Sequence, residues 1–247
     1  MKIVAHRGYS KKYPENTMLA FAEALKQGAD AIELDVHFSS DKKLIVHHDY
    51  GLSYRGGQEG FISELASDYL RTVDVGSWFD PKFADQRMPF LQEVFEALGK
   101  NTQYELELKG FTKEFLMSVM ETVTEHDLLG NIEFTSPHGY MLSALKRSYP
   151  RAKIGLFNQP LPDWMNERIG KAIIKNNALL DGIDVIHLPL SLLSAEYVAE
   201  LHAEKFLVHA ANCETEAELK MAYDAEADQL TTNSLDTAIL VKKKYGK

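Results

Sequence analysis

Short runs of β-branched and aliphatic residues alternate with amphipathic helical segments along almost the whole of this chain. Nine runs have the composition of buried strands: 2–6, 31–36, 43–48, 104–108, 132–136, 152–157, 182–188, 205–210 and 228–232. Strands that alternate with helices pair in parallel and are covered by those helices, so the pattern predicts an α/β fold. Closed into a ring, the units form a (β/α)8 TIM barrel, which typically takes about 250 residues. An open, doubly wound sheet is the alternative, but no glycine-rich dinucleotide turn follows any strand.

Two helical segments carry clear end signals. In "NTMLAFAEALKQG" the spacing predicts Asn16 as the N-cap and Gly28 as the stop. In "TEAELKMAYDAEA" the residues Thr215 and Glu218 have the spacing of a capping box. Both signals support helices between the predicted strands.

The interval between the second and third predicted strands is short. Only residues 37–42 separate them, whereas a parallel crossover needs about a dozen residues or more. These two runs are therefore expected to form an antiparallel hairpin, with its turn near residues 39–43, or an irregular excursion. Setting the returning arm aside leaves eight parallel strands for the barrel.

The pattern changes between Asp49 and Met88. This stretch is rich in glycine, aromatic and charged residues, with a single helical hint near 63–70. Loops of this length in compact domains are usually functional or form a small subdomain. We interpret the chain as one TIM-barrel domain, 1–247, with a capping insertion at about 50–88 after the third strand segment. A surface insertion without function is the alternative.

Composition limits the classes of partner. The formal net charge is −9 and Lys and Arg form no long stripe, which argues against nucleic acid or an anionic membrane as the main partner. No apolar run approaches the ~20 residues of a membrane span, and "MKIVAHRG" is unlike a signal peptide. The single cysteine, Cys213, excludes an internal disulfide. We expect a cytoplasmic protein without stable membrane insertion; the sequence leaves the oligomeric state open, a homo-oligomer included.

Acidic residues alternate with apolar ones on two of the predicted strands. Because strand side chains alternate between faces, Glu33 and Asp35 point the same way, as do Glu105, Glu107 and Lys109. Carboxylates that converge in a barrel repel unless a cation lies between them, and oxygen-only ligands suit Mg²⁺, Ca²⁺ or Mn²⁺. The alternative is a solvated strand edge where these acids pair with lysines.

Histidines end the first predicted strand and the hairpin arm. His6 and His48 would lie beside the carboxylates at the C-terminal rim of a barrel, where general acid–base groups act. His47 must face away from its neighbour, and we expect a structural role for it. Arg7 offers a planar guanidinium for a phosphate or carboxylate, with Glu15 as a candidate anchor. The set fits phosphoryl transfer.

Five motifs occur in a characteristic order: "AHRG", "PENT", "AIELDV", "LIVHHD" and "YELELK". Together they resemble the signature of the glycerophosphodiester phosphodiesterase family, tightly over residues 4–109 and more loosely to "ADQLTTNSLD". The resemblance implies a TIM-barrel enzyme that hydrolyses small glycerophosphodiesters to sn-glycerol 3-phosphate and an alcohol. It implies that Glu33, Asp35 and Glu107 hold one divalent cation, Mg²⁺ or Ca²⁺, with Mn²⁺ as a further candidate.

The same resemblance implies roles for the remaining groups. His6 and His48 match the family's catalytic pair, Arg7 its phosphate contact and Lys109 its second cationic contact. One histidine would take the proton of the glycerol 2-hydroxyl, which attacks phosphorus, while the other protonates the departing alcohol. Water would then open the cyclic phosphate, with the histidines exchanging roles.

Three positions depart from the family pattern. His209 and Asn233 stand where the family usually has tryptophan and aspartate, and Glu105 where asparagine is common. These changes leave open a relative with an altered leaving group, such as a lysophospholipase D or a teichoic-acid-type polymer hydrolase. An apolar or extended groove near 49–88 would favour that alternative, and the candidate lining of either kind is Tyr54, Phe61, Trp78 and Phe79. A non-catalytic binding domain is a further alternative.

Overall fold

A computed structural model describes residues 1–54, 57 and 59–246. The chain divides into two compact units. The N-terminal unit is Ala5–Ile132, and the C-terminal unit is residue 133 onward together with Met1–Val4.

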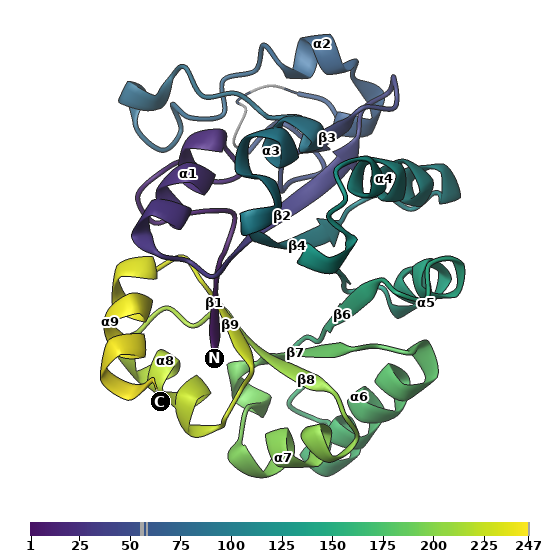
Figure 1. The fold of residues 1–247 in the computed structure, drawn as a ribbon, viewed down its shortest axis with the longest axis vertical. Coiled ribbons are helices and arrows are strands. Elements are labelled where there is room, and N and C mark those ends of the chain that lie inside the picture. The colour runs from purple at the N-terminus through teal and green to yellow at the C-terminus, as the bar shows by residue number, and fades with distance from the viewer. Residues whose placement is uncertain (55–56, 58, 247) are drawn as a thin grey trace. The chain divides into compact units, whose positions relative to one another are not determined.

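Strands and helices alternate along the chain in the described residues (Figure 1). The strands are β1 (Lys2–Ala5), β2 (Ala31–Phe38), β3 (Leu44–Val46), β4 (Gln103–Leu108), β5 (Ile132–Ser136), β6 (Lys153–Phe157), β7 (Val185–Pro189), β8 (Leu207–Ala211) and β9 (Gln229–Thr232). The α-helices are α1 (Met18–Gln27), α2 (Ser67–Leu70), α3 (Leu91–Leu98), α4 (Lys113–Glu125), α5 (Gly139–Ser148), α6 (Glu167–Asp181), α7 (Ala195–Ala203), α8 (Glu216–Asp224) and α9 (Leu235–Tyr245). Each predicted strand run is therefore confirmed, with ends that differ by a few residues.

In the N-terminal unit, β2 lies between β4 and β3. It runs parallel to β4, with Asp35 opposite Glu107, and antiparallel to β3, with Val36 opposite Val46. The Ser39 amide donates to the Lys43 carbonyl at 3.0 Å, which closes the predicted turn. The antiparallel hairpin is confirmed.

In the C-terminal unit, the sheet order is β1-β9-β8-β7-β6-β5, and the pairs from β5 to β9 are parallel. Sheet order follows chain order here, with a helix after each strand, as in a (β/α)8 barrel. Apart from the antiparallel arm β3, the strands of the described chain are those of such a barrel. The fold class is the (β/α)8 TIM barrel.

The start of α1 differs from the prediction by one residue. Thr17, not Asn16, is the N-cap, and its hydroxyl accepts from the Ala20 amide at 3.2 Å. Asn16 has a left-handed backbone (φ 55°), and its side chain donates to Asp35 instead of capping the helix. The other end signals are confirmed: Gly28 is the left-handed C-cap of α1, and Thr215 with Glu218 forms a capping box at α8.

The segment 49–88 has a small apolar cluster of its own within the N-terminal unit. A 3₁₀ turn at Ile62–Glu64 and the helix α2 stand where the sequence hinted at helix. The buried side chains of this cluster are Ile45, Leu52, Ile62, Leu70, Val73, Val75 and Met88. Part of the insertion, residues 55, 56 and 58, lies outside the described residues. The segment is thus anchored on β3, immediately before His47 and His48.

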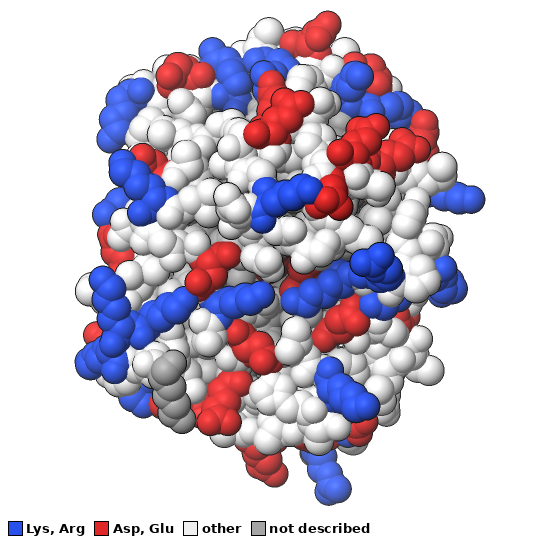
Figure 2. Space-filling model, viewed as in Figure 1, with Lys and Arg blue, Asp and Glu red and all other residues white. Residues whose placement is uncertain are grey.

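Charged side chains of both signs are interspersed on the face seen in Figure 2. Among the described residues, no helix combines the length and the apolar character that crossing a bilayer requires.

Candidate metal and catalytic site

The parallel pairing of β2 and β4 brings three carboxylates together. Each of Glu33, Asp35 and Glu107 offers an oxygen, and these oxygens lie within 4.8 Å of one another. Glu33 and Asp35 are buried and Glu107 is partly exposed. The site therefore lies at one side of the sheet in the N-terminal unit, and it combines close negative charges with limited hydration.

Two cationic side chains flank this carboxylate cluster. The Lys109 ammonium lies 3.2 Å from Asp35 Oδ1 and 2.5 Å from Glu107 Oε1. The Arg7 guanidinium donates to Glu15 Oε1 at 2.9 Å, and its Nε lies 3.5 Å from Asp35 Oδ2. Glu15, the candidate anchor, thus contacts Arg7.

The charges shift the carboxyl groups in opposite directions. Burial, with Asp35 close by, raises the pKa of Glu107 to about 7 and that of Glu33 well above its usual value. Burial acts against ionisation of Asp35 too, but Lys109 and Arg7 hold its pKa below the usual range. One carboxylate is firmly ionised beside two that readily take up protons, which is what a cluster short of positive charge shows. Three carboxylate oxygens fit the hard-cation ligand set of Mg²⁺, Ca²⁺ or Mn²⁺.

His48 is the imidazole whose surroundings favour proton transfer. Its Nδ1 lies 2.8 Å from Asp49 Oδ1, so Nδ1 carries the proton and Nε2 has the free lone pair. Partial burial, together with Arg7 and Lys109, lowers the pKa of His48. The ring is therefore neutral near pH 7, and its side chain remains about 30% exposed.

A tight turn follows β1 and carries His6 and Arg7. The Arg7 amide donates to Glu33 Oε2 at 2.7 Å, and Ser10 Oγ donates to the His6 carbonyl at 2.7 Å. Arg7 has a left-handed φ of 55° and Gly8 one of 82°. A Cβ on Gly8 would lie 2.7 Å from the backbone of Ala20, so this turn requires glycine. The turn therefore places His6 directly before Arg7, whose backbone amide and side chain both contact the carboxylate cluster.

Three further residues shape the site in ways that the sequence pattern does not predict. Asn16 donates to Asp35 Oδ2 at 2.8 Å, and Asp49 holds His48. His37 is buried with its Nε2 3.3 Å from the His48 carbonyl oxygen. The role of Asp49 could have been recognised in the sequence, because it directly follows His48. Asn16 and His37 are distant in sequence from the residues they contact, so only the folded structure reveals their roles. His47 is buried, and its amide donates to the Asp35 carbonyl at 3.1 Å.

Two of the positions that differ from the resembled pattern, His209 and Asn233, lie in the C-terminal unit. His209 is fully buried in β8. Asn233 donates from its backbone amide and its side-chain amide to Glu214 Oε1, at 2.8 and 2.9 Å. An aspartate at this position would present a second carboxylate to Glu214 instead of a donor.

The sequence from residue 6 to residue 237 matches the profile of the Glycerophosphoryl diester phosphodiesterase family. The chain belongs to this family. A glycerophosphodiester phosphodiesterase of Caldanaerobacter subterraneus subsp. tengcongensis is 35% identical over 161 residues, which cover 64% of this chain. The matched part spans 66% of the length of that relative, and 54% and 45% of the next two curated relatives.

Two other comparisons extend over nearly the whole family domain. A glycerophosphodiester phosphodiesterase of Bacillus altitudinis is 26% identical over 251 residues, 98% of both chains. The solved structure of an Oleispira antarctica phosphodiesterase, in complex with the product sn-glycerol-3-phosphate, superposes with a TM-score of 0.85. It is 24% identical and the match covers 98% of this chain and 97% of that one. At this identity the superposition supports the barrel fold of the family member described here.

Proposed function

We propose that this protein hydrolyses glycerophosphodiesters to sn-glycerol 3-phosphate and an alcohol, using one divalent cation. The observation that carries the proposal is the convergence of Glu33, Asp35 and Glu107 beside two fixed cations, Arg7 and Lys109. Family membership and the product named for the Oleispira antarctica relative support the substrate class.

The carboxylates would hold the cation, which when bound supplies charge neutralisation for a phosphate oxygen. Arg7 and Lys109 are placed to bind the other phosphate oxygens, because a phosphate would exchange with their present carboxylate partners. Arg7 and Lys109 would therefore pair with carboxylates before the substrate binds and with phosphate oxygens afterwards.

The imidazoles would move the protons. His48, neutral with its Nε2 lone pair free, takes the proton of the glycerol 2-hydroxyl, whose oxygen then bonds to phosphorus. As the bond from phosphorus to the alcohol oxygen breaks, protonated His6 donates its proton to that oxygen. In the second half-reaction His6 takes a proton from water and the water oxygen bonds to phosphorus. The bond from phosphorus to the glycerol 2-oxygen breaks, and His48 returns its proton to that oxygen. Both histidines end as they began.

One observation favours a second candidate, a lysophospholipase D-like specificity. Tyr50 and Phe111 stack with ring centroids 6.2 Å apart, and about half of each side chain is exposed. Each ring lies two residues beyond a proposed site residue, His48 and Lys109 respectively. An exposed aromatic pair at this position suits a substrate with an apolar portion.

A substrate panel tests the proposal. Glycerophosphocholine, -ethanolamine, -glycerol and -inositol, and lysophosphatidylcholine, are incubated with the protein and Mg²⁺ or Ca²⁺, and glycerol 3-phosphate and lysophosphatidate are measured. We expect glycerol 3-phosphate from the glycerophosphodiesters, and its loss in Glu107→Gln. The exposed acid Glu114 provides the control, since Glu114→Gln should retain activity.

The panel also separates the two candidates. Lysophosphatidate from lysophosphatidylcholine, without glycerol 3-phosphate from the smaller substrates, would replace the first candidate by the second. If the metal-loaded protein released neither product, both would be rejected.

A further inference from the structure

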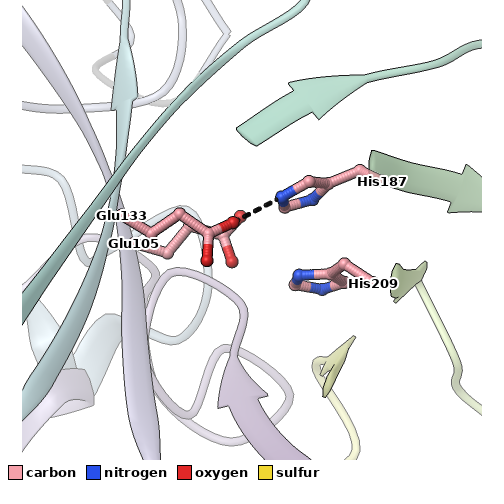
Figure 3. A group of neighbouring side chains, drawn as sticks. All are labelled: Glu105, Glu133, His187 and His209. Carbon is pink, nitrogen blue, oxygen red and sulfur yellow. Dashed lines mark hydrogen bonds and ion pairs between the residues drawn. The ribbon is translucent and has the colours of Figure 1, made fainter. Parts of the chain in front are cut away.

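A second cluster of polar side chains is buried within the C-terminal unit. The side chains of Glu133 on β5, His187 on β7 and His209 on β8 point toward one another (Figure 3). Their exposed fractions are 5%, 1% and 0% respectively. One ligand-type atom from each lies within 4.8 Å of the others. The proposed reaction uses none of the three, and so many polar groups in a barrel interior call for an explanation.

Glu133 is the centre of this cluster. Its Oε1 accepts from His187 Nε2 at 2.8 Å. Its Oε2 accepts from Gln229 Nε2 at 2.9 Å and lies 2.8 Å from the Lys153 ammonium. Burial works against ionisation, but His187 and Lys153 lower the pKa of Glu133. Both oxygens of Glu133 thus face donors, including the Lys153 ammonium, which is the setting of a negatively charged carboxylate.

The hydrogen bonds of His209 define which of its nitrogens has a lone pair. Gln229 Nε2 can only donate, so His209 Nδ1, 3.0 Å away, is the acceptor. The same amide nitrogen contacts Glu133, so the lone pair of His209 is directed to the side on which Glu133 lies. His209 Nε2 then carries the proton and donates to Thr231 Oγ1. A histidine that binds metal through one nitrogen usually has its other N–H held in this way.

Space beside the cluster depends on a glycine in the middle of β6. A Cβ on Gly155 would lie 2.6 Å from Glu133 Oε1 and 2.7 Å from His187 Nε2. Glycine inside a strand weakens it, and commonly marks a place where another group approaches closely. Here the missing side chain leaves room for the two atoms that would be ligands.

We propose that Glu133, His187 and His209 form a second metal site, for a first-row transition ion such as Zn²⁺ or Co²⁺. Two imidazoles and one carboxylate are a ligand set for such ions, unlike the oxygen-only cluster of the N-terminal unit. Ligands bonded at about 2.1 Å in a tetrahedral site lie about 3.4 Å apart. Glu133 Oε1 and His187 Nε2 are 2.8 Å apart. For a metal ion to replace the proton between them, this distance has to increase by roughly half an ångström.

Metal binding would rearrange few groups. The His187 proton moves from Nε2 to Nδ1, and the Gln229 amide turns away from His209 Nδ1. Thr231 keeps its bond to His209, and Lys153, whose side chain is one-third exposed, keeps contact with Glu133 Oε2. Because the ligands are buried, loading would occur as the chain folds.

The test uses the full chain with its first site disabled by Asp35→Asn and Glu107→Gln. The protein is expressed in minimal medium supplemented with Co²⁺, and cobalt content and visible absorption are measured after purification. We expect one cobalt per chain with the absorption of a nitrogen- and oxygen-ligated ion. His187→Gln and His209→Gln should lose it, whereas the partly exposed His202 serves as the control, as His202→Gln should keep it. Thr231→Val should weaken Co²⁺ binding ~10–100-fold.

A cobalt-free protein, or equal cobalt in folded His187→Gln and His209→Gln variants, would overturn the proposal in favour of a purely structural hydrogen-bond network. If those variants do not fold, imidazole ¹⁵N spectra of the protein carrying only the first-site substitutions decide the matter. Ring-nitrogen signals of His187 and His209 that are the same in protein expressed with Zn²⁺ and in protein expressed without it would contradict the site.

Discussion

At the scale of single residues, the pair His48–Asp49 has the clearest consequence for catalysis. Asp49 sets the tautomer of His48 and so determines which nitrogen can accept a proton. We predict that His48→Ala lowers kcat by ~10²–10⁴-fold, the usual contribution of a general acid–base group, while the folded structure is retained. Asp49→Asn should lower kcat less, with KM nearly unchanged, because it affects the orientation of the ring rather than the binding of phosphate. Steady-state kinetics and circular dichroism check both variants.

The control for this pair is His126→Gln, a histidine at the end of α4. It should have wild-type kcat. Near-normal turnover in folded His48→Ala would remove His48 from the mechanism.

His37 makes the stability of the protein depend on pH. Burial lowers the pKa of this ring to about 3, below the value near 6.5 of an exposed histidine. Between these two values the unfolded chain binds a proton at His37 that the folded chain does not. The stability that the protein gains from a neutral His37 is therefore complete above about pH 6.5 and is lost as the pH falls towards 3. Between pH 6.5 and 5 the loss is about 2 kcal/mol.

Urea unfolding at several pH values, in EDTA, compares the wild type with His37→Gln. The difference in unfolding free energy between the wild type and His37→Gln should shrink by about 2 kcal/mol between pH 6.5 and 5. The other titrating groups are the same in both proteins and cancel from this difference. A difference that is constant with pH would show that His37 is not buried as a neutral ring.

Alternation along two strands placed Glu33, Asp35, Glu105 and Glu107 on common faces, whereas only the oxygens of Glu33, Asp35 and Glu107 form one cluster in the N-terminal unit. Alternation alone did not distinguish Glu107 from Glu105; the family resemblance did. Alternation could not predict Asn16, because two adjacent residues can cap α1 and only the fold decides that Thr17 does so. Glu133, His187 and His209 come from separate strands and have no local motif, so their contact depends entirely on sheet register.

At the scale of elements, the turn after β1 links fold and site. Gly8 combines a left-handed backbone with direct contact to Ala20 of α1, whereas Gly182 has a left-handed backbone and open space around it. We predict that Gly182→Ala costs about 1 kcal/mol of unfolding free energy, from backbone strain alone. Gly8→Ala should cost about 3 kcal/mol or more, because α1 must also shift.

Chemical denaturation measures both free energies, and the turnover of Gly8→Ala should fall as His6 and Arg7 move. Equal losses in the two variants would contradict the close approach of the turn to α1.

The elements were predictable where local rules dominate. The short interval between β2 and β3 argued against a parallel crossover and favoured a hairpin, and the structure has one. The segment 49–88 was recognisable as irregular, but its apolar cluster around Ile45 and Leu52 was not, because its members are spread over more than forty residues without helical or strand periodicity.

At the scale of the whole molecule, the fold class followed from the order of strands and helices, since few architectures accommodate that order. The carboxylate cluster of the N-terminal unit makes the stability of the protein depend on a bound cation. In the absence of a cation, burial and the nearby charge of Asp35 oppose the ionisation of both Glu33 and Glu107. We predict that Mg²⁺ or Ca²⁺ raises the melting temperature, with a gain of about 2.7 kcal/mol at one hundred times Kd.

Differential scanning fluorimetry with EDTA and with a series of cation concentrations measures this effect. The variant Asp35→Asn with Glu107→Gln should show no such shift. An unchanged melting temperature of the wild type at all cation concentrations would argue against the carboxylate cluster as a binding site.

The groups proposed to bind phosphate, hold the first cation and move protons all lie between His6 and Lys109. They occupy a contiguous stretch of about one hundred codons in the gene. A single crossover between β4 and β5 would therefore transfer this entire inventory from one homologue to another. Natural recombination, or a deliberate chimera, could in this way exchange the second half of the barrel without dividing the reactive groups between two parents.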